Sequence, residues 1–361
     1  MVKIAAVFAG QGAQYPGMGK SLCESSAAAR AVFEAAGDKV MRDCFEATQD
    51  ELNQTDVTQP AVYTVDMAAW AAFEEAIGGE IEIVGMAGFS LGEYAAFTAA
   101  GVIPGVRHGI ALIKERGRLM AAAGKHHDGT PRGAMAAVLG AKDDIVELVE
   151  RARGQWVLEA VNFNAPTQTV IAGDAEAIEA FSAAAKASGK KLRVMPLPVS
   201  TAFHSPIMAA ASDGIRAAAA KLPFGEPKHE VYLNMTAGTL TEYIGNGLGN
   251  GFGDGMDGDD SAGIVIGVEL AGIIPRVMAE QVKSPVRWQE TIEALAAAGA
   301  EAIVEFGPGK TLTGLAKKTA PNIPALNVQD VDSLTAAAGQ LSKSHDSIKS
   351  QIKSWQERVL K

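Results

Sequence analysis

The sequence predicts an α/β protein with a parallel sheet and an inserted small domain. A continuous apolar run, "KIAAVFAG" (3–10), and a second strand, "EIEIVGMAG" (80–88), alternate with helical patterns, which indicates a parallel sheet covered by helices on both faces. Residues 133–197 are predicted instead to form strand–helix–strand–strand–helix–strand, the ferredoxin-like order. The 361 residues are enough to build both units.

Glycines and a proline mark where the predicted strands and helices of the larger unit begin and end. The run 3–10 ends in "GQG" and is predicted to be a buried first strand. The helical pattern 59–77 has Pro60 near its start, where proline suits a first turn. The second strand, 80–88, ends in a sharp turn into the helix "LGEYAAFTAAG" (91–101).

The remaining elements divide the chain into domains. In the small unit we expect the strands "GAMAAVLG", "WVLEAVNFN", "QTVIAGD" and "KKLRVMPLP" and the helices "DDIVELVERAR" and "EAIEAFSAAAKASG". The α/β pattern then resumes with strands at 230–234 and 301–306 and helices at 206–221, 264–282, 288–298 and 310–318. We therefore expect a larger domain of residues 1–130 and 198–343, a small domain of residues 131–197 and a helical tail of residues 344–361.

Two segments stand apart from this pattern. Residues 241–263 are rich in Gly and Asp and predict a surface loop, but their acids lack the spacing of a calcium loop. The tail places Ile348, Ile352, Trp355 and Val359 on one helical face. We expect this face to dock on the protein's own body, and a partner groove is the alternative.

Composition excludes several classes of function. The net charge of −10 argues against nucleic acid or an anionic membrane as the main partner. Two cysteines, Cys23 and Cys44, cannot build a disulfide framework, and no metal-ligand spacing surrounds them. We expect a cytoplasmic protein without a metal. No apolar run approaches the ~20 residues of a membrane span, and the apolar start fits a first strand better than a signal peptide.

The segment "GMAGFSLGEYAAF" (85–97) has the small–x–Ser–x–Gly spacing of a serine nucleophile. In a tight turn from strand to helix, a Cβ on either flanking residue would clash, and Gly88 and Gly92 stand at those two positions. Ser90 would lie at a helix N-terminus, which favours a developing oxyanion. Ser90 is the candidate nucleophile, with a purely structural turn as the alternative. Phe89 cannot carry a proton, so the base must come from elsewhere.

Three other segments could complete such a site. His204, in "PVSTAFHSPIM", lies between a strand and a helix, where α/β sites form, and a neutral imidazole there could take the serine proton. A structural histidine is the alternative. Arg116, in "IKERGRLM", could hold a substrate carboxylate if buried, and otherwise is a solvated helix residue. The glycines of "FAGQGAQYPGMG" (8–19) leave N–H groups free to face an anion, without the dinucleotide pattern G-x-G-x-x-G.

Seven ordered segments resemble the malonyl-CoA:acyl-carrier-protein transacylases and the related acyltransferase domains of polyketide synthases. They are "FAGQGAQYPGMG", "GFSLGEYAAFTAAG", "ERGRLM", "NFNAPTQTVIAGD", "STAFHSPIM", "QVKSPVRW" and "VEFGPGKTLTGL", and they span nearly the whole chain. The resemblance implies an α/β-hydrolase-like catalytic domain with a ferredoxin-like insert. It implies transfer of malonyl from malonyl-CoA to the pantetheine thiol of acyl carrier protein, in a ping-pong reaction through an acyl ester.

The resemblance also implies roles at matching positions. Ser90 would carry the acyl ester and His204 would be the base. The backbone N–H groups of Gln11 and Leu91 would hold the oxyanion. Arg116 would pair with the free carboxylate of malonyl.

Four further positions would surround the substrate. Gln281, in "QVKSPV", would lie beside the site near the backbone that orients the histidine, and Asn162 would line the pocket. Phe203, in "AFH", resembles the malonyl-type pattern and would crowd an α-methyl group, a discrimination worth ~1–3 kcal/mol. The family usually has histidine where Phe89 stands, and we expect Phe89 to form an apolar wall beside Ser90.

Two other functions remain open: a serine thioesterase or esterase on the same turn, and a carrier-docking module with a degenerate site. We expect no cofactor beyond malonyl-CoA as substrate, and a monomer. Carrier proteins are acidic, so docking should use a local basic surface. The candidates are Lys190, Lys191 and Arg193, or Lys317 and Lys318, and a solvated face is the default interpretation of both groups.

Overall fold

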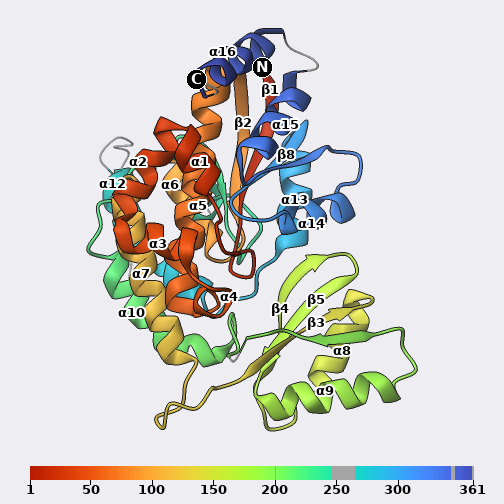
Figure 1. Cartoon of the computed structure of the whole chain (residues 1–361). Helices are drawn as coiled ribbons and strands as arrows, with labels where there is room; N and C mark the ends of the chain where they lie inside the picture. The colour runs from red at the N-terminus through yellow and green to blue at the C-terminus, as the bar shows by residue number, and fades with distance from the viewer. Residues whose placement is uncertain (200, 246–264, 343–345, 360–361) are drawn as a thin grey trace.

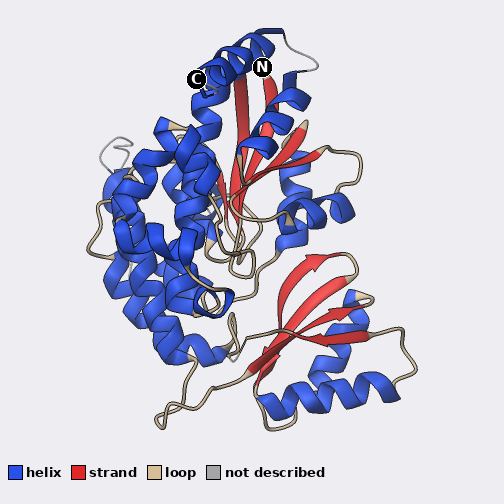
Figure 2. Cartoon of the chain, viewed as in Figure 1, coloured by secondary structure: helices blue, strands red, loops and turns tan. Residues whose placement is uncertain are grey.

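Figure 1 shows the computed structural model, which describes residues 1–199, 201–245, 265–342 and 346–359. A larger body surrounds one sheet, and a smaller unit surrounds a second (Figures 1 and 2). The larger sheet has the strand order β7-β2-β1-β8-β9, and each adjacent pair is parallel. Its strands are β1 (Val2–Phe8), β2 (Ile81–Gly88), β7 (Val231–Tyr232), β8 (Ala302–Phe306) and β9 (Ala325–Val328). The predicted parallel sheet is confirmed.

Side chains of β1 alternate between two cores, which explains its continuous apolar sequence. Ile4 and Phe8 belong to the core on one face, and Ala5 and Val7 to the core on the other. The first core receives side chains from α1 (Lys20–Ser25), α2 (Ala27–Ala36), α3 (Asp38–Glu46), α4 (Gln49–Leu52), α5 (Thr55–Ile77), α6 (Gly92–Ala99) and α7 (Val106–Ala123). The second receives them from α13 (Trp288–Ala297) and α14 (Thr311–Thr319). The sheet is therefore covered on both faces, as predicted.

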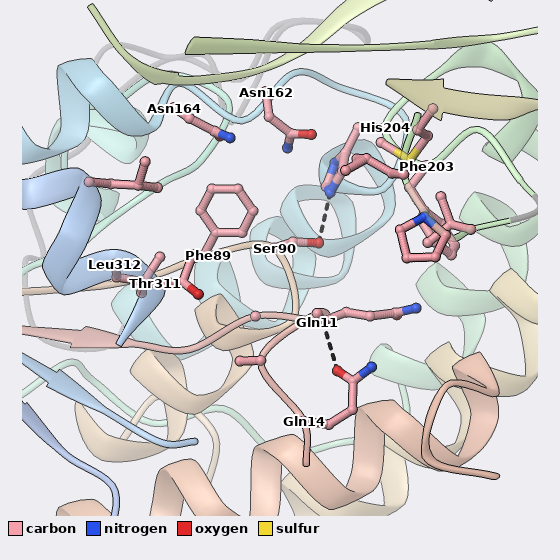
Figure 3. A pocket seen from close by; sticks show the side chains of 18 of the residues that line it. Gln11, Gln14, Phe89, Ser90, Asn162, Asn164, Phe203, His204, Thr311 and Leu312 are labelled. Carbon is pink, nitrogen blue, oxygen red and sulfur yellow. Dashed lines mark hydrogen bonds between the residues drawn. The ribbon is translucent and has the colours of Figure 1, made fainter. Parts of the chain in front are cut away.

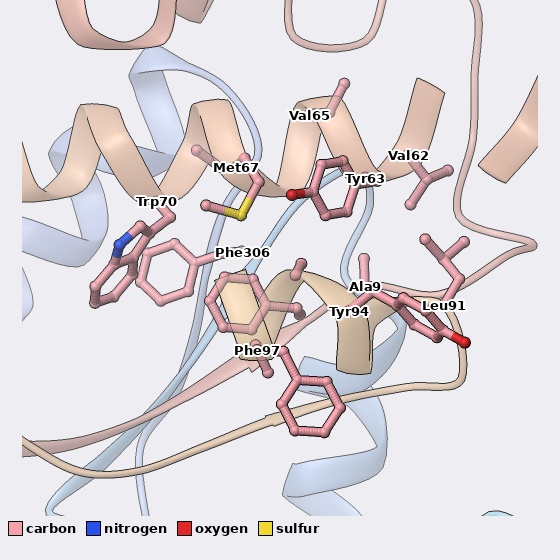
Figure 4. Packing of buried hydrophobic residues seen from close by; sticks show 14 of the residues in the cluster. Ala9, Val62, Tyr63, Val65, Met67, Trp70, Leu91, Tyr94, Phe97 and Phe306 are labelled. Atoms are coloured by element: carbon pink, nitrogen blue, oxygen red, sulfur yellow. The ribbon is translucent and has the colours of Figure 1, made fainter. Parts of the chain in front are cut away.

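Helix α5 is the central element of the first core (Figure 4). Its Trp70 meets Phe306 of β8 edge to face, with ring centroids 5.1 Å apart, and Phe306 also packs on Phe8. The helix begins at Thr55, so the expectation that Pro60 stands in its first turn was wrong. The carbonyl of Gln54 accepts hydrogen bonds from the N–H groups of two following residues, which starts the helix more than a turn before the proline.

The small sheet has the strand order β4-β5-β3-β6, and all its adjacent pairs are antiparallel. The unit runs β3 (Ala134–Leu139), α8 (Lys142–Ala152), β4 (Leu158–Ala165), β5 (Gln168–Gly173), α9 (Ala175–Ala187) and β6 (Arg193–Pro196). This is the predicted order of strands and helices. Its own core includes Ile145 of α8 and Phe181 of α9. Val286, just before α13, exchanges backbone hydrogen bonds with Val161 and Phe163 of β4 and so ties this sheet to the larger body.

The rest of the chain packs mainly on the first core. Its elements are η1 (Gly78–Glu80), η2 (Pro206–Met208), α10 (Ala209–Ala219), α11 (Leu240–Gly245), α12 (Val265–Gln281), α15 (Val331–Leu341) and α16 (Asp346–Val359). The helix expected at 206–221 is thus a 3₁₀ turn followed by α10, and the strand expected at 230–234 is only the two residues of β7. β9 and α15 were not predicted. No helix in the described part of the chain is long and apolar enough to cross a membrane.

The prediction for the tail can be compared with the structure in part, and that for the Gly/Asp-rich segment only at its first residues. Ile352 and Trp355 of α16 are buried in the first core, so this part of the tail docks on the protein's own body, as expected. The side chains of Ile348 and Val359 lie outside the described part. The first residues of the segment 241–263 continue α11, and residues 246–263 lie outside the described residues.

Candidate active site

Ser90 occupies a strained turn between β2 and α6. Its φ angle is +55°, in the left-handed region that few non-glycine residues adopt. A Cβ on Gly88 would lie 1.9 Å from the backbone of Gly92, and one on Gly92 would lie 2.3 Å from the carbonyl oxygen of Phe8. Both glycines are therefore required sterically, as the sequence pattern predicted.

The side chain of Asn234, two residues beyond β7, forms two hydrogen bonds with the backbone of this turn. Its Oδ1 accepts a hydrogen bond from the backbone N–H of Ser90 at 2.8 Å, and its Nδ2 donates to the carbonyl of Gly88 at 2.7 Å. This residue was not among the predicted site residues. The available signal was an asparagine just past a strand at the carboxyl edge of the sheet, where site residues gather.

His204 lies against the serine (Figure 3). Its Nε2 is 2.7 Å from Ser90 Oγ, and its Nδ1 is 3.1 Å from the backbone carbonyl oxygens of both Gln281 and Ser284. Because carbonyls only accept, Nδ1 carries the proton and Nε2 is left to accept from the serine hydroxyl. Burial, and then the charge of Arg116, lower the pKa of His204 to about 4. The imidazole is therefore neutral at neutral pH, as a general base requires.

This pKa makes a testable prediction about pH. Serine acylation should keep its full rate from about pH 8 down to about pH 5, because neutral His204 is the active form, and it should be halved near pH 4. An unperturbed histidine would instead halve the rate near its ordinary pKa of about 6.5. Single-turnover acylation across this range, with folding checked by circular dichroism, measures the difference. An acid limb near 6.5 in folded enzyme would contradict it.

Arg116 is buried, with 1% of its surface exposed, so the alternative of a solvated helix residue is wrong. Its Nη1 donates to Gln59 Oε1 at 2.8 Å, and its Nη2 donates to Gln281 Oε1 at 3.1 Å and to Ser90 Oγ at 3.2 Å. Its guanidinium carbon lies 5.0 Å from the centre of the Tyr94 ring. These hydrogen-bond partners are neutral, so none of them forms an ion pair with the guanidinium beside Ser90.

A cavity of about 520 Å³ opens over Ser90, between the carboxyl edge of the large sheet and the small sheet. Seven of the nine predicted site residues line it: Gln11, Phe89, Ser90, Arg116, Asn162, Phe203 and His204. Leu91 and Gln281 are fully buried behind it. β4, residues 197–199 and Phe203 supply the wall opposite the serine turn, so both units contribute to one pocket (Figure 3).

Two backbone N–H groups are available to an oxyanion. Neither Gln11 N–H nor Leu91 N–H donates to any described atom, and Leu91 stands at the N-terminus of α6. Gln11 follows Gly10, where a Cβ would meet the carbonyl oxygen of Phe89 at 2.5 Å. That close approach brings the loop after β1 against the serine turn.

Phe89 is half-buried, and its ring packs edge to face on Trp288, with centroids 5.3 Å apart. It lines the cavity beside Ser90, where an apolar wall was expected. Phe89→His should therefore lower serine acylation by less than tenfold, which corresponds to about 1.4 kcal/mol. Single-turnover rates of the two proteins test this, and a larger loss would show that the phenyl ring has a specific role.

The cavity wall contains further polar residues that were not predicted to belong to the site. Asn164 lies beside Asn162 in Figure 3, and its Oδ1 has no hydrogen-bond partner among the described residues. On another side, Gln14 and Gln49 both donate to Asn53 Oδ1 at 3.0 Å, which makes a wall of side-chain amides. Asn164 lies on β4, whereas Gln14, Gln49 and Asn53 lie on loops and a short helix, where no sequence periodicity points to a cavity.

Comparison with known proteins assigns this geometry to a family. The family model described as "Acyl transferase domain" matches residues 6–359. The malonyl CoA-acyl carrier protein transacylase of Salmonella typhimurium is 35% identical over 345 residues, which cover 94% of this chain and 100% of the relative. The protein of the same name from Bacillus subtilis is 32% identical over 355 residues, which cover 96% and 99%.

Solved structures agree with these relatives. A malonyl CoA-acyl carrier protein transacylase from Clostridium perfringens superimposes with a TM-score of 0.80 at 30% identity, covering 95% of this chain and 98% of the other. A malonyl-transacylase solved in complex with a type II PKS acyl-carrier protein superimposes with a TM-score of 0.78 at 32% identity, covering 93% and 98%.

Proposed function

This chain belongs to the acyltransferase family that includes the malonyl CoA-acyl carrier protein transacylases, and we propose that it moves malonyl from malonyl-CoA to the pantetheine thiol of an acyl carrier protein. The observation that carries this proposal is a buried arginine that shares a cavity with a Ser–His pair. Ser90 Oγ lies within hydrogen-bond reach of both His204 Nε2 and Arg116 Nη2. A nucleophile so close to a buried positive charge suits an acyl group that ends in a carboxylate.

The first half-reaction forms an acyl-enzyme. His204 Nε2 takes the proton of Ser90 Oγ, which attacks the thioester carbonyl while the N–H groups of Gln11 and Leu91 hold the oxyanion. The C–S bond then breaks, and the imidazolium returns the proton to the CoA sulfur. The carbonyls of Gln281 and Ser284 hold Nδ1–H throughout, so the ring keeps its orientation without a carboxylate partner.

The second half-reaction runs the same steps in reverse. The carrier thiol loses its proton to His204 and attacks the Ser90 ester, and the serine leaves with that proton. Arg116 holds the malonyl carboxylate in both halves. Phe89 and Phe203 give the cavity apolar walls, and Phe203 limits the room for an α-methyl group.

The architecture supports the finer features of this proposal. The strand order β4-β5-β3-β6 with two helices is that of a ferredoxin-like domain, which we place at residues 131–197. Residues 1–130 and 198–343 form the catalytic domain, whose strand–serine–helix turn is of the α/β-hydrolase type. We propose that the protein acts in the cytoplasm as a monomer, without a bound cofactor.

The basic surface on α14 is the better candidate for docking the acidic carrier. Lys318 donates to Gln168, a residue that lines the cavity, so this helix borders the active site. On the other candidate surface, Lys190 is already paired with Asp144 and Glu147. We therefore place the carrier over Lys317 and Lys318, where the pantetheine arm has a short path to Ser90.

The product of a single turnover tests the function. Enzyme loaded with malonyl-CoA and then mixed with a holo acyl carrier protein should yield malonyl-carrier, seen by intact-mass spectrometry. Free malonate with unmodified carrier would support the thioesterase alternative. Carrier binding without any adduct on the enzyme would support the docking module.

A further inference from the structure

Glu93, in the first turn of α6, is a buried carboxyl that the mechanism above does not use. It is 1% exposed and does not line the cavity. Its Oε2 accepts hydrogen bonds from Gln281 Nε2 at 3.0 Å and from the backbone N–H of Asn234 at 3.2 Å. Its Oε1 has no partner among the described residues. Burial of a carboxyl costs stability unless hydrogen bonds or an opposite charge offset it, and here only Oε2 is hydrogen-bonded.

The side-chain amide of Gln281 lies between two acceptors and a donor. Nε2 donates to Glu93 Oε2 and to the carbonyl of Ser90 at 2.6 Å, and Oε1 accepts from Arg116 Nη2. Exchanging the amide oxygen and nitrogen would place oxygen against two acceptors and NH₂ against the guanidinium. Glu93 is one of the two acceptors that make the present orientation the favourable one.

In this orientation, the Gln281 amide oxygen accepts a hydrogen bond from Arg116 and so helps to fix the guanidinium. Its guanidinium has one amide oxygen, from Gln59, on Nη1 and a second, from Gln281, on Nη2. Together they fix the plane and direction of the fork next to Ser90 Oγ. Loss of the second oxygen would leave one end of the fork free to rotate away from the position that an acyl carboxylate must meet.

We propose that Glu93 is a positioning residue that orients the Gln281 amide and, through it, sets the preference of Arg116 for acyl groups that end in a carboxylate. This role rests on the proposed function, because it concerns the choice of acyl group. It requires an acceptor atom at Oε2, not a negative charge.

The titration of Glu93 is compatible with this role. Burial raises its pKa to about 7, against the hydrogen bonds from Gln281 and Asn234 and the charge of Arg116. The charged or titratable groups that face it are Arg116 of α7 and Tyr94 of its own helix. A proton on the unpartnered Oε1 leaves both hydrogen bonds to Oε2 in place. The acyl preference should therefore be the same at pH 6 and pH 8.

Two substitutions separate the acceptor from the charge. Glu93→Gln keeps an oxygen for Gln281 Nε2 and should keep the ratio of malonyl to acetyl kcat/KM within about twofold. Glu93→Leu removes the acceptor and should lower that ratio at least tenfold, mainly through a higher KM for malonyl-CoA. Thr98→Val, at another buried polar residue of α6, is the matched control and should leave the ratio unchanged. The ratio is independent of the fraction of enzyme that is folded.

Gln281→Leu provides a second measurement that leaves Glu93 intact. It should lower the ratio as Glu93→Leu does, and the double variant should show no additional loss, because both act through one chain of hydrogen bonds. The role of Glu93 is overturned if the malonyl-to-acetyl ratio is unchanged in Glu93→Leu or in Gln281→Leu. It is also overturned if Glu93→Gln lowers the ratio as much as Glu93→Leu does. A wild-type enzyme that forms no malonyl adduct overturns the proposed function instead.

Discussion

Ser90→Ala is expected to abolish the malonyl adduct and to lower malonyl transfer by about 10⁶-fold, as loss of the nucleophile does in serine hydrolases. The hydroxyl is the only group that changes: the N–H of residue 90 still donates to Asn234, and the flanking glycines still hold the turn. The measurement is intact mass after mixing with malonyl-CoA, which should rise by one malonyl group in the wild type alone.

Ser284→Ala is the matched control for this experiment. Ser284 orients His204 through its backbone carbonyl, which alanine retains, so its adduct should form at close to the wild-type rate. A malonyl adduct that survives Ser90→Ala would place the acyl group on another residue and refute the assignment.

Arg116→Ala should reduce malonyl transfer far more than acetyl transfer. Truncating one partner of a buried, hydrogen-bonded charge pair costs about 2–5 kcal/mol, because the other charge is left buried without a counter-charge. Malonyl has such a charge and acetyl has none. Both substrates share the lesser cost of the unpaired Gln59 and Gln281 oxygens, so the ratio of their kcat/KM values isolates the carboxylate contact.

Arg116→Lys sharpens this measurement. Lysine keeps the charge but lacks the planar fork that Gln59 and Gln281 hold. The ratio of malonyl to acetyl kcat/KM in Arg116→Lys should therefore fall between the ratios of the wild type and Arg116→Ala. Equal losses of malonyl and acetyl transfer in Arg116→Ala would remove the proposed role of the arginine as carboxylate anchor.

The parts of the fold that could be predicted have strong local signals. β1 is a continuous apolar run because both faces of its sheet are covered, and such a run is visible in the chain without any knowledge of its partners. The small unit was predictable because its strands and helices follow each other in sequence. β9 was not predicted because it has only four residues, whereas α15 was not predicted although its 11 residues equal the length of α8. Pro60 was misplaced because a helix boundary depends on hydrogen bonds upstream of the pattern.

In the candidate site, too, some residues have a local sequence signal and others have none. The glycines around Ser90 can be interpreted from the chain, since a strand that turns sharply into a helix leaves no room for Cβ atoms. Asn234 and Glu93 gave no comparable signal. Each acts through hydrogen bonds to partners that are more than 100 residues away in sequence.

Local patterns in the chain were thus sufficient for the alternation of strands and helices, the serine turn and the family. They could not establish that Arg116 is buried, that carbonyls rather than a carboxylate hold His204, or that Gln281 joins the two. The reason is physical: backbone sterics act between neighbours in sequence, whereas burial and hydrogen-bond partnership depend on which distant segments the packed sheet brings together.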